Sequence, residues 1–69
     1  MSESIVVFIN QLAHTLPANA SLQDAIQASG VKPPFAAAVN LQFVPRGSYT
    51  QHALSANDQI ELISPITGG

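Results

Sequence analysis

Two neighbouring stretches near the start of the chain show the pattern of paired β-strands. Residues 5–9, IVVFI, are rich in β-branched and aromatic side chains, and residues 12–16 alternate in polarity. Asn10-Gln11 separates them, and asparagine tolerates the positive φ that a tight connection requires. The pattern therefore predicts a β-hairpin over residues 5–16.

Helical spacing follows the predicted hairpin. One face of a helix would carry Leu22, Ala25 and Ile26. Asp24 stands three residues after Ser21, which is the interval of a capping box, and Gly30 offers a C-cap. A pair of prolines follows Gly30 after two intervening residues, and proline cannot continue the helix. These signals predict one short helix over about residues 21–29.

The second half of the chain predicts further strands. Residues 35–39 are apolar and compact, which indicates a strand. A turn and a short strand at 43–44 follow, and that strand ends at Pro45 because proline cannot donate to a ladder. Residues 47–53 have mixed polarity and predict an irregular or single-turn link. The last predicted strand, QIELIS, carries isoleucine or leucine on both faces, so alternation leaves open which face points outward.

This order of elements predicts an α+β fold. One helix would cover one face of a mixed sheet of four to five strands, and the other face would stay partly open. A chain of 69 residues forms a single core. We expect the domain to span residues 1–64 and to be followed by a flexible tail at 65–69, which has little apolar surface to bury.

Composition argues against several classes of function. Lys32 and Arg46 are the only strong cations and the net charge is −2, so a surface that binds nucleic acid or an anionic membrane is not expected. No apolar run approaches the roughly 20 residues of a spanning helix. Cysteine is absent, which excludes disulfides and thiolate sites and fits a cytoplasmic location. A charged content of only 9% suggests that some apolar surface stays exposed.

The polar side chains show no catalytic or metal-binding spacing. His14 and His52 have no carboxylate placed beside them, so a structural role is favoured over that of a base or ligand. Asp24 and Asp58 are interpreted as helix-start and turn residues rather than an acid pair. We therefore expect neither a catalytic residue nor a metal site in this chain.

The last residues and one arginine offer other kinds of site. Gly68 and Gly69 have no Cβ, so they could thread a narrow channel while a nucleotide approaches the terminal carboxyl carbon. A carboxylate is a poor acyl donor until it is adenylated, so such chemistry would need ATP on another protein. The alternative is an ordinary frayed end. Arg46 is either a solvated side chain or an anchor to an acidic partner or to backbone carbonyls.

Taken together, these segments resemble the ThiS/MoaD family of β-grasp, ubiquitin-like sulfur carriers, most closely the sulfur carriers of thiamine biosynthesis. The resemblance runs from VVFINQ through SLQDAI and AAAVNLQFVPRGSY to NDQIELISPITGG. Its most specific parts are Val44-Pro45-Arg46 and the terminal Gly68-Gly69. The resemblance implies a β-grasp fold and a protein cosubstrate instead of an enzyme.

The resemblance also implies a set of partners. In that family a ubiquitin-activating-type adenylyltransferase (ThiF-like) uses ATP to adenylate the terminal carboxylate, and a persulfide donor converts it to a thiocarboxylate. A ThiG-like thiazole synthase then takes the sulfur. By this resemblance Gly69 carries the sulfur, no cofactor is bound, and docking is expected on the open sheet face. The tail that enters the partner clefts would be Ile66, Thr67 and Gly68, and the docking residues would be Phe43, Arg46 and Ile63.

Two alternatives stay open. The chain could be the small subunit of molybdopterin synthase, a carrier of the same chemistry, or a non-catalytic β-grasp interaction module with an inert terminus. The sequence also departs from the family pattern at two turns, since family members commonly have glycine where this chain has Leu41 and in the turn at 56–58. These departures leave the local turn types open.

Overall fold

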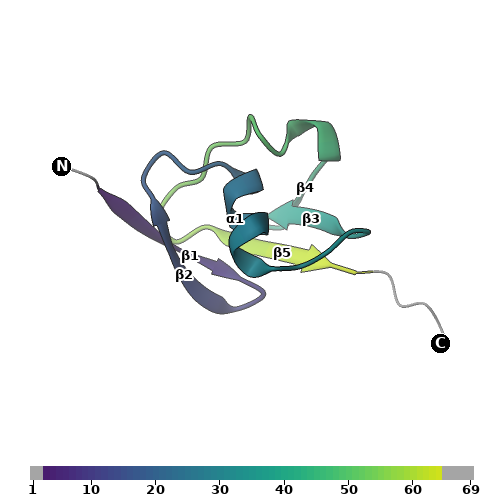
Figure 1. Cartoon of the computed structure of the whole chain (residues 1–69), viewed down its shortest axis with the longest axis horizontal. Coiled ribbons are helices and arrows are strands. Elements are labelled where there is room, and N and C mark those ends of the chain that lie inside the picture. Colours follow the sequence, from purple (N-terminus) through teal and green to yellow (C-terminus); the bar gives the residue numbers. More distant parts are fainter. Residues whose placement is uncertain (1–2, 65–69) are drawn as a thin grey trace.

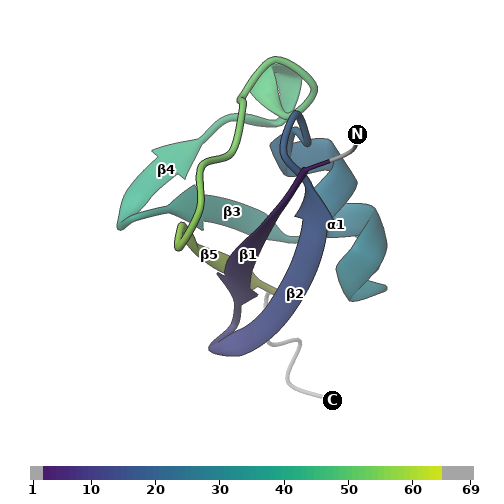
Figure 2. The ribbon, with the colours of Figure 1, turned by 90° about the vertical axis from the view of Figure 1, so that its left-hand side faces the viewer.

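The computed structural model describes residues 3–64 and shows a mixed sheet with one α-helix on one face (Figures 1 and 2). This is the β-grasp arrangement that the sequence predicts. The elements in chain order are β1 (Ser4–Ile9), β2 (Leu12–Pro17), α1 (Leu22–Ser29), β3 (Ala36–Val39), β4 (Gln42–Val44), the short 3₁₀ helix η1 (Arg46–Ser48) and β5 (Gln59–Ile63). The predicted tail at 65–69 lies outside the described residues.

The last strand lies in the middle of the sheet. The strand order is β2-β1-β5-β3-β4, in which β5 is parallel to β1 and antiparallel to β3. Two antiparallel hairpins, β1-β2 and β3-β4, therefore flank β5 on its two sides. The strand that leads into the C-terminal tail is thus paired along both edges, and the chain leaves the sheet at its end (Figure 1).

The core lies between α1 and the sheet face beneath it. Leu22, Ile60 and Val7 are the largest fully buried side chains. Alternation along β5 decides which of its faces is internal, since Ile60 and Leu62 are buried whereas Glu61 and Ile63 are exposed. The sheet face opposite α1 is consequently the open one.

The signals at both ends of the helix act as predicted. The Ser21 hydroxyl accepts a hydrogen bond from the Asp24 backbone N–H at 3.3 Å, and the Ser21 N–H donates to the Asp24 carboxylate at 2.9 Å. Gly30 closes the helix with a φ of 75°. The Leu22 N–H donates to the His52 carbonyl at 2.8 Å, which ties the start of α1 to the link before β5.

Both hairpins turn through residues with positive φ. Asn10 and Gln11 have φ values of 51° and 72°, and Asn40 and Leu41 have values of 52° and 69°. Two consecutive positive values at the centre of a two-residue loop define a type I′ turn. The chain thus forms this turn at Leu41 without the glycine that the position favours.

Replacing Leu41 with glycine should stabilise the domain. The leucine side chain is 87% exposed, so its removal loses little packing, while the left-handed backbone no longer carries a Cβ. We expect the free energy of unfolding in urea to rise by up to about 1 kcal/mol. Leu41→Ala is the matched control, because it removes the same side chain and keeps the Cβ. An equal gain in both variants would contradict the backbone explanation.

Candidate functional site: the open sheet face and the end of β5

The predicted sulfur-carrying tail lies beyond the described part of the chain. Gly69, Gly68, Thr67 and Ile66 all fall outside residues 3–64. The structure describes the part of the chain that precedes the tail, namely β5, Ser64 after it, and the surfaces around them.

The open face of the sheet gathers exposed apolar side chains. Phe43 is 70% exposed, Ile63 59% and Val6 40%. Ala38 pairs with both Phe43 and Glu61, and Ala36 pairs with Ile63, so small residues separate the two large ones. Alternation along each strand places these side chains on the same face. We call the surface formed by Val6, Ala36, Ala38, Phe43, Glu61 and Ile63 the open face; by the same alternation, half-buried Phe8 and exposed Gln59 lie on this side of the sheet as well.

Only one of the six residues that define the open face is charged. Glu61 is exposed on β5 between the two ends of the patch, and the other five side chains carry no charge. Exposed apolar surface of this kind marks interaction sites on proteins. The exposed apolar surface that the composition predicts is therefore present, and it borders the point where the chain leaves the sheet.

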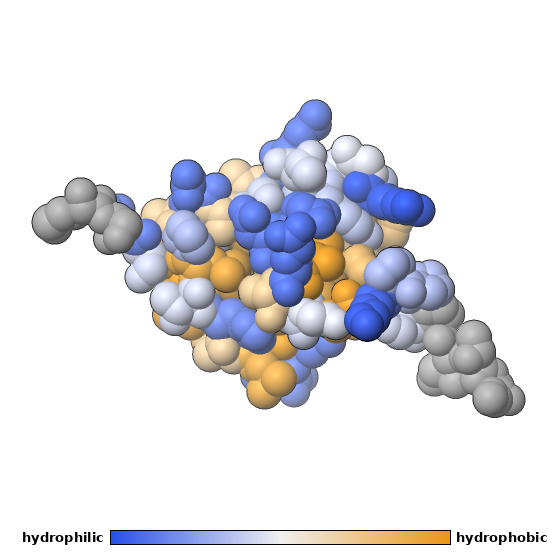
Figure 3. All heavy atoms as spheres, viewed as in Figure 1, coloured by the Kyte–Doolittle hydropathy of each residue, from blue (hydrophilic) through white to orange (hydrophobic). Residues whose placement is uncertain are grey.

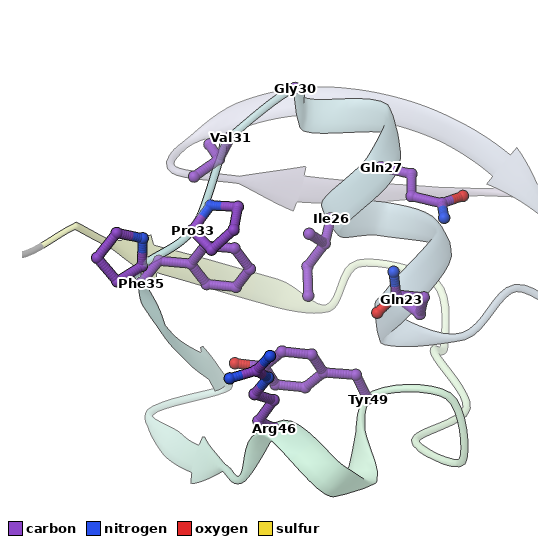
Figure 4. Close-up of a pocket in the computed structure, with 10 residues that line it drawn as sticks. Gln23, Ile26, Gln27, Gly30, Val31, Pro33, Phe35, Arg46 and Tyr49 are labelled. Atoms are coloured by element: carbon purple, nitrogen blue, oxygen red, sulfur yellow. The ribbon is translucent and has the colours of Figure 1, made fainter.

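Arg46 does not lie on the open face. It is the first residue of η1 and lines a groove on the helix side of the sheet, between α1, the segment at 31–35 and η1 (Figure 4). Of the three predicted docking residues, the fold thus brings Phe43 and Ile63 to one surface and Arg46 to another.

The groove has a volume of about 580 Å³. Phe35 and Tyr49 stack on one another inside it, with ring centroids 6.0 Å apart and planes inclined by 11°. Strand β3 begins at Ala36, one residue later than the sequence pattern predicts.

Two asparagine side chains form hydrogen bonds with the backbone of β5, one at each edge of the strand. The Asn10 side-chain amide donates to the Leu62 carbonyl at 3.3 Å and accepts from the Leu62 N–H at 2.9 Å, so it extends the β1-β5 ladder by one step. On the other edge the Asn40 amide oxygen accepts from the Gln59 N–H at 3.0 Å. The Asn40 amide nitrogen donates to Asp58 at 3.1 Å. The sequence pattern predicts only turns at these two positions, Asn10-Gln11 and the connection before residues 43–44.

Removing the Asn10 side chain should loosen the end of β5. In Asn10→Gly both hydrogen bonds to Leu62 are lost, while glycine keeps the positive φ of the turn without strain. We expect the free energy of unfolding to fall by about 1–2 kcal/mol. Amide hydrogen exchange at Leu62 should accelerate more than exchange at Ile60. Asn19→Gly, in an exposed turn, is the control, and unchanged protection of Leu62 would contradict this role for Asn10.

The remaining polar candidates take structural positions. Asp24 caps α1, and Asp58 accepts from the Ser55 N–H at 2.8 Å in the turn before β5, as predicted. His14 lies on β2 opposite Val7, and His52 lies in the link where its carbonyl meets α1. Within residues 3–64, no group of three or more His, Asp or Glu side chains is placed to hold a metal ion. In the same part of the chain, no helix is long and apolar enough to cross a membrane.

Known proteins were compared with the chain by sequence and by structure. The model of the ThiS family matches residues 3–69, which includes the terminal glycines. The fold is similar to the crystal structure of a thiamine biosynthesis protein (ThiS) from Geobacter metallireducens, with a TM-score of 0.77 over 94% of this chain and 100% of that chain. The two sequences are 14% identical, so this likeness concerns the fold. No curated protein matches the chain.

Proposed function

Because the chain belongs to the ThiS family of small sulfur carrier proteins, we propose that its Gly69 carboxylate is converted to a thiocarboxylate that donates sulfur for thiazole formation in thiamine biosynthesis. The observation that carries the proposal is the family match, which extends through Gly68 and Gly69. The chain would act as a protein cosubstrate with ATP used by a partner. The architecture supports this role, since the tail continues from the central strand of the sheet, which is paired on both edges.

The proposed chemistry exchanges one oxygen of the terminal carboxylate for sulfur. The Gly69 carboxylate attacks the α-phosphorus of ATP, pyrophosphate leaves, and an acyl adenylate forms. The terminal sulfur of a persulfide donor then attacks the acyl carbon and AMP leaves with the former carboxylate oxygen. A thiol cleaves the resulting sulfur–sulfur bond and releases the thiocarboxylate. Glycine suits this position because no side chain obstructs either attack.

The proposed partners are an adenylyltransferase of the ubiquitin-activating type (ThiF-like), a persulfide donor and a thiazole synthase (ThiG-like). We assign docking to the open face, where Phe43 and Ile63 flank small residues beside the exit of the tail. We also propose a cytoplasmic location, because the chemistry needs ATP and a reducing thiol.

The direct test is the intact mass of the purified full chain after incubation with the activating enzyme, ATP and a persulfide donor. The expected product is heavier by the difference between one sulfur and one oxygen atom, and fragmentation places the change in the C-terminal peptide. An unmodified mass with active enzyme and a functioning control carrier would overturn the proposal. Supplying the product separately to thiazole synthase and to the large subunit of molybdopterin synthase then distinguishes the two sulfur-carrier pathways.

Substitution on the open face should weaken docking without unfolding the domain. Phe43→Ser removes the most exposed aromatic side chain of the patch, and an aromatic side chain that becomes buried at an interface can account for about 2 kcal/mol of binding. We expect the KM of the activating enzyme for this chain to rise by about tenfold or more. Leu12→Ser is the matched control, because Leu12 is 67% exposed but lies on β2, at the opposite edge of the sheet from Phe43 on β4. An equal effect of the two substitutions would rule out a specific role for the open face.

A further inference from the structure

The groove beside α1 has a composition unlike that of the open face. Three segments line it: α1, the stretch at 31–35 and the region of η1 (Figure 4). Its lining includes Gln23, Ile26, Gln27, Phe35, Arg46 and Tyr49. Seen from the side of α1, apolar atoms lie open between polar side chains (Figure 3). The groove thus combines an apolar floor with amide groups and a guanidinium at its rim.

The charge of the groove is opposite to that of the protein. Arg46 lines it and is the single charged residue of the lining. No aspartate or glutamate is among the lining residues. Asp24, the acidic residue of α1, is already bonded to the N-terminal cap. The acid of the open face, Glu61, lies on the other side of the sheet.

The walls of the groove are held in place by backbone hydrogen bonds. The Gln23 N–H donates to the Tyr49 carbonyl at 3.1 Å, and the Tyr49 N–H donates to the Arg46 carbonyl at 3.3 Å. Ile26 and Tyr49 are 6% and 8% exposed, so their positions are fixed by the core. A ligand would therefore enter a preformed groove and would not have to order it first.

We propose that this groove is a second docking site, separate from the open face, which takes an extended segment of a partner protein carrying an acidic side chain next to a bulky apolar one. The carboxylate pairs with the Arg46 guanidinium, a planar group suited to bidentate contact with carboxylates. The apolar side chain covers Ile26 and Phe35. The side-chain amides of Gln23 and Gln27 offer hydrogen bonds to the backbone of the segment.

A peptide segment fits this groove better than a small phosphorylated ligand. Arg46 is the single charged residue of the lining, whereas a phosphate group is usually held by several donors. The apolar floor supplies surface that a partner side chain can bury. This inference goes beyond the proposed carrier function and depends on the groove alone, so it stands whether or not Gly69 carries sulfur.

Peptide titration of the ¹⁵N-labelled full chain tests the inference. The probes are acetylated and amidated pentapeptides with aspartate or glutamate on both sides of a central leucine, phenylalanine or tryptophan. The matched probes carry lysine in place of each acid. We expect an acidic peptide to shift the amide signals of Ile26, Gly30, Arg46 and Tyr49 and to leave those of Phe43 and Ile63 unchanged. The lysine peptides should cause no such shifts.

A variant separates charge recognition from simple apolar contact. Arg46→Gln should weaken binding of the acidic peptide by about fivefold to tenfold, and Phe43→Ser should leave it unchanged. Arg46 is exposed and its side chain is free of the core, so the domain should remain folded, as its amide spectrum will show. Absence of binding by every acidic peptide, equal binding of the lysine peptides, or shifts centred on the open face would each overturn the proposal.

Discussion

A chain extended by one alanine after Gly69 should form no thiocarboxylate and should remain fully folded. In the proposed chemistry the reacting group is the carboxyl carbon of Gly69, and an added residue converts it into an unreactive peptide bond. The new carboxylate would belong to a residue with a Cβ, and it would be displaced by at most about 3.3–3.6 Å along the chain. Both changes make the terminal carboxylate a poor match for an activating enzyme whose active site accepts a C-terminal glycine.

The measurement is the intact mass after incubation with activating enzyme, ATP and persulfide donor, together with a thermal unfolding curve. An alanine added before Met1 is the control, because it lengthens the chain equally and leaves the C-terminus unchanged. A midpoint that matches the parent chain shows that the fold is intact. Sulfur incorporation into the extended chain at the parent rate would exclude Gly69 as the sulfur-carrying residue and would favour the inert-terminus interpretation.

Leu22→Ala should be strongly destabilising. Leu22 has no exposed surface and belongs to the core between α1 and the sheet. Truncation of a buried leucine costs about 2–5 kcal/mol, because apolar transfer is lost and a cavity remains. A domain of this length has a total stability of roughly 3–10 kcal/mol. The variant should therefore lose between a fifth and the whole of the free energy of unfolding. The hydrogen bond from residue 22 to the His52 carbonyl is made by the backbone N–H, so the substitution retains it.

Urea unfolding of the two variants checks this expectation. Leu12→Ala is the matched control, since it is the same substitution at a side chain that is 67% exposed, and surface changes usually stay within about 0.5 kcal/mol. Alanine is also the better helix former, so helix propensity does not account for a loss at Leu22. Similar effects at the two positions would contradict the assignment of Leu22 to the core.

Local signals in the sequence predict the elements well. The capping box at Ser21, the left-handed cap at Gly30 and the strand end at Pro45 each depend on residues close together in the chain, and all three are present. Alternation in β5 predicts its two faces but not which of them is internal. That choice depends on α1, which packs on the face that carries Ile60 and Leu62.

Interactions between distant parts of the chain are what the sequence does not reveal. The hydrogen bonds of Asn10 with Leu62 span 52 positions, and a turn role already explains why asparagine stands there. The separation of Arg46 from Phe43 is a second feature that the local sequence does not reveal. The two residues are close in sequence, but Pro45 and η1 redirect the chain, so that one side chain lies on the open face and the other in the groove.

The central position of β5 also governs when the domain can form during synthesis. Among the strands of residues 3–64 the ribosome makes β5 last, yet both hairpins of the sheet pair with it and not with each other. An emerging chain that ends before Gln59 holds two hairpins and a helix with no common strand to join them, and pairing between β1 and β5 closes a loop of about fifty residues. Folding of the domain therefore completes only after β5 has left the ribosome. A partner that recognises the folded surface therefore binds only molecules in which β5 has already been synthesised. The residues proposed to react come shortly after this strand in the sequence.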